Sequence, residues 1–368
     1  KLIWKYMKPK KVIINLLPFD RKLSGTGYFF FRLFKEILKI DSSNYYELHL
    51  SSNIDAFKDL EKANNVKFLY HNVPKSKIIR VIYEQLIFPF KISGDIFFSP
   101  SVAIPFIFKF SAKTYITTIH DVVPYIFKKY QPIQQLYVKL ISKICAIRSD
   151  IIITVSENSQ SDIVKYLKIK KSKIHIIYNF LNEEKLPIAK QKLRDNFFIT
   201  VSTVQPGKNL IRLIESFHMF NLQNPDFKLY IVGNLGWNYD DVIRLVDKYK
   251  MNESVLFLGY VSDEDLKKLY CTARALLYVS LYEGFGIPPL EAMFYKCPIV
   301  VSNISSLPEV AGDAGVYVDP YNITDILRGM NEALEIDLDT YAINSNIQCN
   351  KFNGETEAGK FLELINNN

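Results

Sequence analysis

The chain has 368 residues, which is too long for one ordinary core and suits two domains. A hydrophobic fraction of 48% with 23% charged residues excludes a disordered or fibrous chain. The four cysteines stand far apart and form no CxxC pair. This excludes a disulfide scaffold and a zinc ribbon, and it suits a reducing compartment.

Charge is unevenly distributed along the chain. Residues 1–180 hold 29 basic and 13 acidic side chains, a net charge of +16, whereas residues 181–368 hold 17 and 25, a net charge of −8. Two halves of opposite sign favour two domains with different partners. The basic half suits nucleic acid, an anionic membrane or phosphorylated substrates, but a Lys-rich composition also scatters lysines over any solvated surface.

Targeting signals are not visible in the sequence. No apolar run reaches the ~18 residues of a membrane-spanning helix. The start, Lys1–Lys11, has charge but lacks the apolar centre of a secretory signal. We therefore expect a cytoplasmic protein that associates at most peripherally with the inner membrane face.

Short apolar runs alternate with longer amphipathic stretches in the first half, as in the βα units of a parallel sheet. A helix is expected over Tyr28–Ile40, where Phe31, Phe34, Ile37 and Leu38 fall on one face. Others are expected over 133–147 and after Ser156. The expected strands are Lys11–Leu17, Tyr46–Leu50, Lys67–His71, Ile96–Ser99, Tyr115–Ile119, Ile151–Val155 and Ile174–Tyr178.

The pattern lapses over Asn179–Asn196, which is polar, contains Pro187 and lies where the charge changes sign, so a linker is expected there. In the second half Asn209 is expected to cap a helix that runs to Asn221. Ser262 and Asp265 predict the start of another helix. The expected strands are Phe197–Ser202, Phe227–Val232, Val255–Leu258, Ala275–Val279, Ile299–Ser302 and Val316–Val318.

These elements predict two doubly wound α/β domains that face each other across a substrate cleft. We expect residues 1–180 to form the first domain and residues 181–350 the second. A C-terminal helix within 351–368 is a candidate to pack back on the first domain.

The most informative segment follows an apolar strand and runs from Leu281 to Ala292. Gly284 and Gly286 allow a close backbone approach to a ligand, and the N–H groups of the helix that follows favour an anion. Glu283 and Glu291 flank this turn, and their carboxylates suit sugar and ribose hydroxyls. A Gly/Pro loop with solvated glutamates is an equally good interpretation of the spacing alone.

At this point the chain resembles the retaining nucleotide-sugar glycosyltransferases of family four, which have the GT-B fold. Their signature is two glutamates separated by seven residues, here Glu283 and Glu291. Further stretches agree in the expected order over about residues 11 to 330. They are Ser24-Gly25-Thr26-Gly27-Tyr28, Ile119-His120-Asp121-Val122-Val123-Pro124, Val155-Ser156-Glu157, Pro206-Gly207-Lys208-Asn209, Leu258-Gly259-Tyr260-Val261-Ser262 and Leu307-Pro308-Glu309-Val310-Ala311-Gly312.

The resemblance implies that residues 1–180 form an N-terminal acceptor-binding domain and residues 181–350 a C-terminal donor-binding domain. It also implies roles for individual residues. His120 and Glu283 would be the catalytic pair, with His120 beside the reacting sugar. Glu291 would bind the donor ribose and Lys208 would neutralise the diphosphate. Gly25 and Gly27 would form the family's glycine loop after the first strand, where the leaving phosphate and the acceptor meet. The other donor-binding residues implied are Tyr260, Val261, Gly284, Phe285, Gly286, Ile287 and Leu290.

Each of these residues also has an ordinary interpretation. A lone lysine before a helix is otherwise a surface residue, two glycines after a strand form a turn, and a histidine at a strand end can be structural. The chain also departs from the family pattern, because relatives often carry an arginine where Gly207 or Thr203 stands here. Arg212 is a candidate replacement for that second cation.

The implied activity is metal-independent hexose transfer with retention of configuration, using a nucleotide sugar as substrate and no cofactor. The acceptor would be a glycan or a lipid-linked hydroxyl in surface polysaccharide or glycolipid synthesis. GDP-mannose is the preferred donor, with UDP- and dTDP-sugars as alternatives. The aromatic and basic segments Tyr28–Lys35, Phe106–Lys113 and Tyr125–Tyr130 are candidates to meet lipid headgroups, or are core aromatics with ordinary surface lysines.

Two other functions were weighed against this one. A nucleotide-binding oxidoreductase on a Rossmann-type fold is the main alternative, but the chain lacks GxGxxG after its first strand. A nucleic-acid-binding protein would need a recognised module beside the basic half, and the sequence contains none that we recognise.

Overall fold

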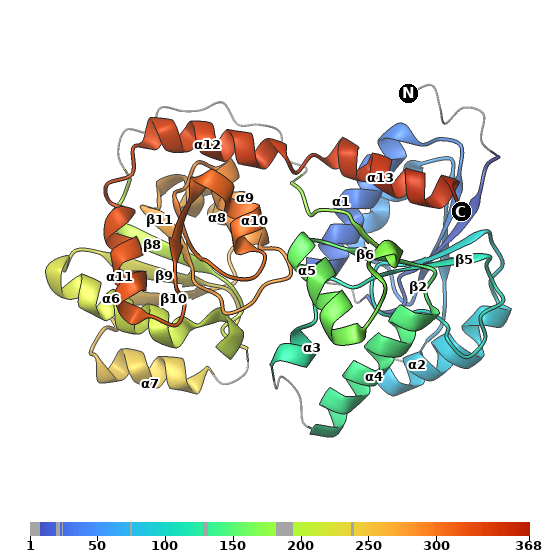
Figure 1. Ribbon diagram of the computed structural model, residues 1–368, viewed down its shortest axis with the longest axis horizontal. Helices are drawn as coiled ribbons and strands as arrows, with labels where there is room; N and C mark the ends of the chain where they lie inside the picture. The colour runs from blue at the N-terminus through green and yellow to red at the C-terminus, as the bar shows by residue number, and fades with distance from the viewer. Residues whose placement is uncertain are drawn as a thin grey trace. The chain divides into compact units, whose positions relative to one another are not determined.

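The computed structural model describes residues 8–19, 23, 25–73, 76–127, 132–181, 194–236 and 239–368. The chain divides into two compact units (Figure 1). The first contains Lys1–Asn182 and Asn353–Asn368, and the second contains Glu183–Phe352. Most of the expected linker and residues 1–7 lie outside the described residues.

The first unit is built on a parallel sheet with the strand order β3-β2-β1-β4-β5-β6-β7. Each strand predicted in this half of the chain is present, with ends that shift by at most two residues. The strands are β1 (Lys11–Asn15), β2 (Tyr45–Leu50), β3 (Val66–Tyr70), β4 (Ile96–Ser99), β5 (Thr114–Thr118), β6 (Ile151–Thr154) and β7 (Ile174–Ile176). Their continuous apolar runs fit strands that are covered on both faces.

Helices cover both faces of this sheet, because most of the parallel strands are connected through a helix. The α-helices are α1 (Gly25–Ile40), α2 (Lys77–Leu86), α3 (Val123–Ile126), α4 (Pro132–Arg148), α5 (Glu157–Asp162) and α13 (Gly354–Asn366). A short 3₁₀ turn, η3 (Phe88–Phe90), follows α2. Ser156 caps α5 as expected, because its side chain accepts a hydrogen bond from the Ser159 N–H.

The buried face of α1 differs from the predicted one by one position. Phe34 and Ile37 are buried as expected, but Phe30 and Leu33 complete the buried stripe, and Phe31 and Leu38 lie at its margins. Tyr28 to Phe31 are all aromatic, so the sequence predicts the helix more reliably than its rotation.

The C-terminal helix α13 belongs to the first unit although the whole second unit precedes it in the chain. It lies beside α1 (Figure 1). Phe361 of α13 packs on Phe98 of β4, with ring centroids 4.9 Å apart. The carboxylate of Glu357 accepts a hydrogen bond from the Tyr178 N–H at 2.9 Å, so the helix is attached through both its apolar and its polar face.

The second unit contains a parallel sheet with the strand order β10-β9-β8-β11-β12-β13. All strands predicted in this half are present within one residue. They are β8 (Phe197–Val201), β9 (Lys228–Val232), β10 (Val255–Gly259), β11 (Ala275–Tyr278), β12 (Ile299–Ser302) and β13 (Gly315–Val318). The helices are α6 (Leu210–Gln223), α7 (Asp240–Lys248), α8 (Asp263–Thr272), α9 (Ile287–Phe294), α10 (Leu307–Ala311), α11 (Ile323–Glu332) and α12 (Leu338–Asn350).

Two predicted helix starts have different outcomes. Ser262 caps α8 as expected, since its hydroxyl accepts the Asp265 N–H at 3.1 Å. Asn209 precedes α6 but does not cap it with its side chain, because its φ of +60° turns the amide away. The Asn209 amide instead donates to the carbonyls of Val279 and Pro320 at 3.0 and 2.7 Å, which ties the start of α6 to the sheet.

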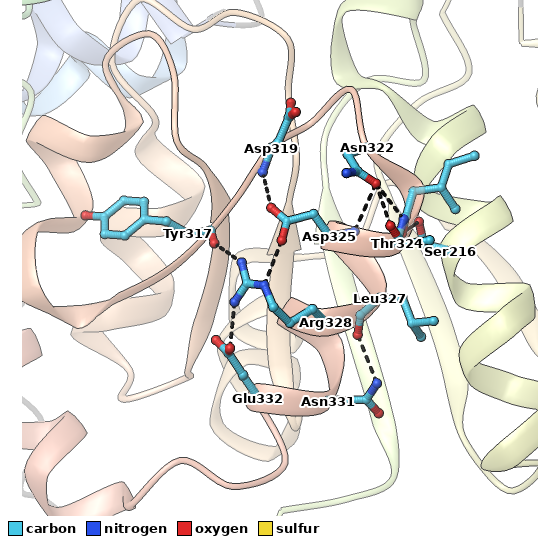
Figure 2. A network of polar contacts seen from close by, with 11 residues as sticks. Ser216, Tyr317, Asp319, Asn322, Thr324, Asp325, Leu327, Arg328, Asn331 and Glu332 are labelled. Atoms are coloured by element: carbon cyan, nitrogen blue, oxygen red, sulfur yellow. Dashed lines mark hydrogen bonds and ion pairs between the residues drawn. The ribbon is translucent and has the colours of Figure 1, made fainter.

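Polar side chains cap helix α11 and link it to a neighbouring strand. Asn322 caps it by accepting the N–H groups of Thr324 and Asp325. Figure 2 shows Arg328 between Asp325 and Glu332, to which it donates at 2.7 and 2.6 Å. The Arg328 guanidinium also reaches the carbonyl of Tyr317, so one side chain links α11 to β13.

In each unit the strand order reverses once, between β1 and β4 in the first and between β8 and β11 in the second. The carboxyl ends of the strands at such a reversal are where open α/β sheets bind ligands. Within the part of the chain that the structure describes, no helix is both long and apolar enough to cross a bilayer.

Candidate active site

Two loops meet at the strand reversal of the second unit. Lys208 ends the 3₁₀ turn η6 (Pro206–Lys208) that follows β8, and Glu283 lies in the loop that follows β11. The Leu281 N–H donates to the Gly207 carbonyl at 2.9 Å, which fastens the two loops together. Neighbouring strands therefore bring together two residues that are 75 positions apart in the chain.

Lys208 and Glu283 form an ion pair, with Nζ and Oε1 2.6 Å apart and side chains only 17% and 13% exposed. The same ammonium donates to the Tyr278 hydroxyl at 3.2 Å. Burial alone would lower the pKa of Lys208, but the Glu283 carboxylate and the Tyr278 hydroxyl raise that pKa above its ordinary value. The lysine is thus a permanent cation at neutral pH.

Two serines hold the turn that begins at Glu283. The Glu283 N–H donates to Ser305 Oγ at 2.9 Å. The Ser306 hydroxyl contacts the carbonyls of Glu283 and Phe285 at 3.0 and 2.7 Å. The backbone of the turn is therefore fixed from the loop after β12, independently of any ligand.

The turn ends at Gly286, where the chain enters α9. Its φ of +116° lies in a region that favours glycine, and a Cβ there would meet Leu307 Cδ2 at 2.8 Å. Helix α9 starts at Ile287 with prolines in its first turn. Pro288 and Pro289 have no N–H group, and the Leu290 N–H donates to the Gly286 carbonyl. Of the first four residues of α9, Ile287 therefore carries the N–H that can meet an anion.

Glu291, the second glutamate of the expected pair, lies half-buried within α9. Its Oε2 accepts a hydrogen bond from the Tyr270 hydroxyl at 3.2 Å. Burial and the nearby carboxylate raise the pKa of Tyr270 well above its ordinary value, so the phenol keeps its proton and donates to Glu291.

Two expected donor-binding side chains, those of Phe285 and Leu290, lie in the core of the unit. Phe285 packs edge-on against Phe352 with centroids 5.2 Å apart, and Leu290 is buried. This arrangement limits both residues to backbone contacts with a ligand. Ile287, by comparison, is half-buried at the first position of α9.

Tyr260 and Val261 follow β10, two strands away from β8 in the sheet. Tyr260 is 76% exposed, so its ring is open to stacking. Arg212, the candidate second cation, donates to Asn209 Oδ1 at 3.0 Å and lies over the ring of Tyr321. The Arg212 guanidinium therefore already contacts two residues of the second unit, Asn209 and Tyr321.

In the first unit, His120 follows β5 and borders a cavity of about 230 Å³ that Thr26, Asp121 and Tyr125 also line. Its Nε2 lies 3.2 Å from the Pro100 carbonyl. Burial lowers the pKa of His120 to about 4, so the ring is neutral at pH 7. Because a carbonyl only accepts, Nε2 carries the proton and Nδ1 is left as an acceptor.

Gly25 and Gly27 do not form the glycine loop that the sequence predicts. Both lie in the first turn of α1. Gly27 is buried against Leu23, whose Cδ2 would lie 2.7 Å from an added Cβ. A larger residue at Gly27 would therefore have to displace the Leu23 side chain, whereas Gly25 has open space around it. Ser24 lies outside the described residues.

Several residues of the site were missed from the sequence. Tyr278 occupies an apolar strand position, and nothing in its neighbours indicates that its hydroxyl reaches Lys208. Ser305 and Ser306 precede Leu307-Pro308-Glu309, where two adjacent hydroxyls before a helix are a usable signal of capping or loop bonding. Among the described residues, no three His, Cys, Asp or Glu side chains gather as a metal site.

Two family models match the chain. "Glycosyl transferases group 1" matches residues 181–348, and "Glycosyltransferase Family 4" matches residues 95–185. O-antigen chain mannosyltransferase B of Escherichia coli is 32% identical over 234 residues, which are 60% of this chain and 61% of the relative. O-antigen chain mannosyltransferase RfbU of Salmonella typhimurium is 33% identical over 206 residues, which are 55% of this chain and 56% of the relative. The matches thus span less than two thirds of either relative.

Solved structures share the fold over nearly the whole chain. HepE of Anabaena, in complex with UDP-glucose, matches with a TM-score of 0.75 at 16% sequence identity. The match covers 98% of this chain and 100% of the HepE chain. WaaG, a glycosyltransferase involved in lipopolysaccharide biosynthesis, matches with a TM-score of 0.71 at 14% sequence identity. That match covers 96% of this chain and 99% of the WaaG chain. The family models and the shared architecture show that this chain belongs to the family 4 glycosyltransferases and has the GT-B fold.

Proposed function

We propose that the protein is a retaining glycosyltransferase that moves a hexose from a nucleotide sugar to a hydroxyl of a glycan or a lipid-linked acceptor. The observation that carries this proposal is the Lys208–Glu283 pair beside the Gly286 turn, at the strand reversal of the second sheet. A cation and the Ile287 N–H at the helix start suit a diphosphate, and a neighbouring carboxylate suits sugar hydroxyls.

The transferred sugar is proposed to be mannose. This choice is supported by the matched relatives, which include two O-antigen chain mannosyltransferases and the serotype-specific mannosyltransferase WbdA of Escherichia coli. GDP-mannose is the preferred donor. HepE was solved with UDP-glucose, so UDP- and dTDP-sugars belong in the test as well. The pathway proposed is surface polysaccharide or glycolipid synthesis.

The reaction is proposed to pass through an oxocarbenium-like state without a metal. The bond between the sugar C1 and the diphosphate oxygen breaks, and a bond from C1 to the acceptor oxygen forms on the same face. The acceptor proton passes to the departing phosphate. Lys208 and the amides of the turn at Gly284, Gly286 and Ile287 stabilise the charge that develops on the diphosphate.

The two glutamates have separate roles in this proposal. Glu283 orients the sugar by accepting its hydroxyl protons and forms no covalent bond to it. Glu291 accepts from the donor ribose, and Tyr270 holds its carboxylate in place. Tyr260 and Val261 border the base. His120, neutral at pH 7, contacts the reacting sugar as a hydrogen-bond partner and not as a charge.

Product analysis tests the proposal. The protein is incubated with GDP-mannose, UDP-glucose, UDP-galactose and dTDP-rhamnose together with glycan and lipid-linked acceptors, and products are identified by mass spectrometry and NMR. We expect one donor to be consumed, with release of its nucleoside diphosphate and formation of a product that keeps the anomeric configuration. Consumption of no donor, an inverted product, or a trapped glycosyl–Glu283 adduct would each contradict part of the mechanism.

A thermal-shift measurement distinguishes the proposal from a nucleotide-binding oxidoreductase. Stabilisation by GDP or UDP is expected, because binding to the folded state alone raises the melting temperature. Stabilisation by NAD and by neither nucleoside diphosphate would favour the oxidoreductase instead.

A further inference from the structure

One side of the first unit exposes apolar side chains on two adjacent helices. On α4, Ile133 is 84% exposed, Leu136 68%, Leu140 54% and Ile147 55%. At 3.6 residues per turn these four positions and Tyr137 fall within an arc of roughly 100°. The opposite side of α4 is also apolar and packs on the sheet through Ile141 and Cys145. The outer side of α4 is therefore apolar as well, and none of the described residues of the unit covers it.

Helix α2, which is drawn near α4 in Figure 1, carries a second stripe of exposed apolar side chains. Ile78, Ile79, Ile82 and Leu86 are 46% to 73% exposed. Tyr83 of α2 and Cys145 of α4 belong to one buried core cluster, so both helices cover the same face of the first sheet. The stripes of α2 and α4 therefore belong to the same side of the unit.

Three phenylalanines extend this side beyond the ends of the helices. Phe90 of η3 contacts Phe108 and Phe110, with ring centroids 5.2 and 5.0 Å apart. Phe90 and Phe110 are nevertheless 64% and 57% exposed. An exposed aromatic cluster beside two exposed aliphatic stripes is an extended apolar patch, and such patches mark protein or membrane contact sites. We call α2, η3, residues 107–110 and α4 together the apolar face.

Charge on the apolar face is mostly positive. Its four segments contain six lysines and arginines and a single acid, Glu84. One of the six, Lys109, is paired with Asp150, which lies two residues beyond the end of α4. Glu84 is buried, and burial raises its pKa to about 7, so it does little to oppose the basic groups. Lys143 and Arg148 are exposed and flank the α4 stripe on its two sides, where long side chains can direct their charges to headgroups.

We propose that the apolar face is a docking surface for an anionic lipid bilayer, with α2 and α4 lying in the plane of the membrane interface. Amphipathic helices with basic flanks and aromatic neighbours bind such interfaces by combining apolar burial with attraction to anionic lipid. Protein interfaces are usually depleted in lysine, so the positive charge favours lipid over a protein partner. The inference names a partner for the proposed function and rests on it only for the lipid-linked acceptor.

The structure changes which predicted segments could meet lipid. The segment Tyr28–Lys35 is largely buried, since Phe29, Phe30, Leu33 and Phe34 lie in the core. The segment Phe106–Lys113 contributes Phe108 and Phe110 to the apolar face. Part of Tyr125–Tyr130 lies outside the described residues, and α2 and α4 carry most of the exposed apolar surface.

Vesicle binding by the whole chain tests the proposal without nucleotide sugar or acceptor. The vesicles are phosphatidylcholine alone or with 30% phosphatidylglycerol, at 20 and 500 mM NaCl. We expect binding to the anionic vesicles at low salt and at least tenfold weaker binding at high salt or to neutral vesicles, because salt screens the lysines. Failure of the wild-type chain to bind anionic vesicles at low salt would overturn the proposal.

Matched variants localise the binding. The triple variant Ile133→Gln/Leu136→Gln/Leu140→Gln keeps good helix formers at exposed positions, so α4 should still fold. We expect it to bind anionic vesicles at least tenfold more weakly. The control Leu222→Gln/Ile343→Gln/Ile347→Gln changes three equally exposed positions of the second unit and should bind within twofold of wild type.

Two further outcomes would overturn the proposal. One is equal vesicle binding by the α4 variant and the wild type. The other is a wild-type dimer in sedimentation velocity that the α4 variant dissociates, with no vesicle binding, since the apolar face would then join two copies. Because no sugar donor is present, loss of vesicle binding and lack of transferase activity are separate results.

Discussion

Among single residues, Lys208 is the centre of the candidate donor site. Its ammonium has three N–H donors, and the contacts to Glu283 and Tyr278 take two of them. The third N–H can meet a phosphate oxygen while the ion pair is kept. Lys208 is thereby oriented before a donor arrives, which lowers the entropic cost of binding.

Tyr278→Phe tests this orientation. The substitution removes one hydrogen bond from Lys208 and leaves the ion pair, so we expect kcat/KM to fall about three- to tenfold, in line with a bond of ~1 kcal/mol. Steady-state kinetics with the accepted donor measures the effect. Tyr230→Phe, on β9, is the control and should leave kcat/KM unchanged. An unchanged kcat/KM in Tyr278→Phe would show that the hydroxyl does not position the lysine.

Buried histidines make stability depend on pH. Burial lowers the pKa of His120 to about 4, whereas an unfolded histidine titrates near ~6.5. Between these values the unfolded chain binds more protons, so the free energy of unfolding falls as the pH falls. We expect His120 to contribute a loss of ~2 kcal/mol between pH 7 and 5.

Urea unfolding of wild type and His120→Gln at pH 7 and 5 measures this contribution. The variant lacks the titrating ring, so its stability should fall by less than that of the wild type over the same interval. His49, whose pKa burial lowers to about 3, remains in both proteins and cancels in the comparison. Equal losses in the two proteins would mean that His120 is not buried as a neutral group.

Among elements, the strands were predicted most accurately. Continuous apolar runs such as Ile151–Thr154 are bounded by polar residues, and both faces of the sheet are covered, so the pattern leaves little choice. The rotation of α1 and the role of Asn209 were predicted less well, because each depends on contacts from distant parts of the chain. Asn209 bonds to Val279 and Pro320, which no local pattern reveals.

The same distinction applies to the candidate site. Glu283, Gly286 and Glu291 lie in one segment with a recognisable spacing, so the sequence indicates them directly. Tyr278 and the two serines after β12 act through neighbouring strands, and sheet order decides their contacts. The glycines after β1 were expected in a loop, but α1 begins at Gly25 and includes them.

The cap of α11 gives a test at this scale. Asn322 accepts two N–H groups at the helix start, and Asn322→Ala should lower the free energy of unfolding of the second unit by ~1 kcal/mol. Asn331→Ala on the same helix is the control, with an expected change below ~0.5 kcal/mol, because it is exposed and only contacts the Leu327 carbonyl (Figure 2). Urea denaturation measures both, and equal losses would contradict the capping role.

At the scale of the whole molecule, the first unit is built from two separate stretches of the chain, one before and one after the second unit. The final helix α13 completes the first unit after the chain has formed the second. Phe361 carries much of this attachment, since it is buried and packs on Phe98 at the centre of the first sheet. Stability of the first unit therefore depends on residues that follow the second unit in the sequence.

Phe361→Ala should destabilise the first unit by ~3–5 kcal/mol, through lost burial and the cavity that remains. Hydrogen exchange followed by mass spectrometry should show faster exchange in β1 and β4, with β8 and β11 unchanged. Ile343→Ala, at an exposed position of α12, is the control. Equal acceleration in both units would show that they do not unfold separately.

The central claim is that Lys208 holds the diphosphate of a nucleotide sugar. Isothermal titration of GDP, UDP and dTDP into wild type, Lys208→Ala and the exposed control Lys228→Ala tests it most directly. We predict that wild type and Lys228→Ala bind one of these diphosphates with affinities within twofold, and that Lys208→Ala binds it at least ~30-fold more weakly, the loss expected for a charged hydrogen bond. Equal affinity in all three proteins, or no binding of any diphosphate by the wild type, would contradict the account.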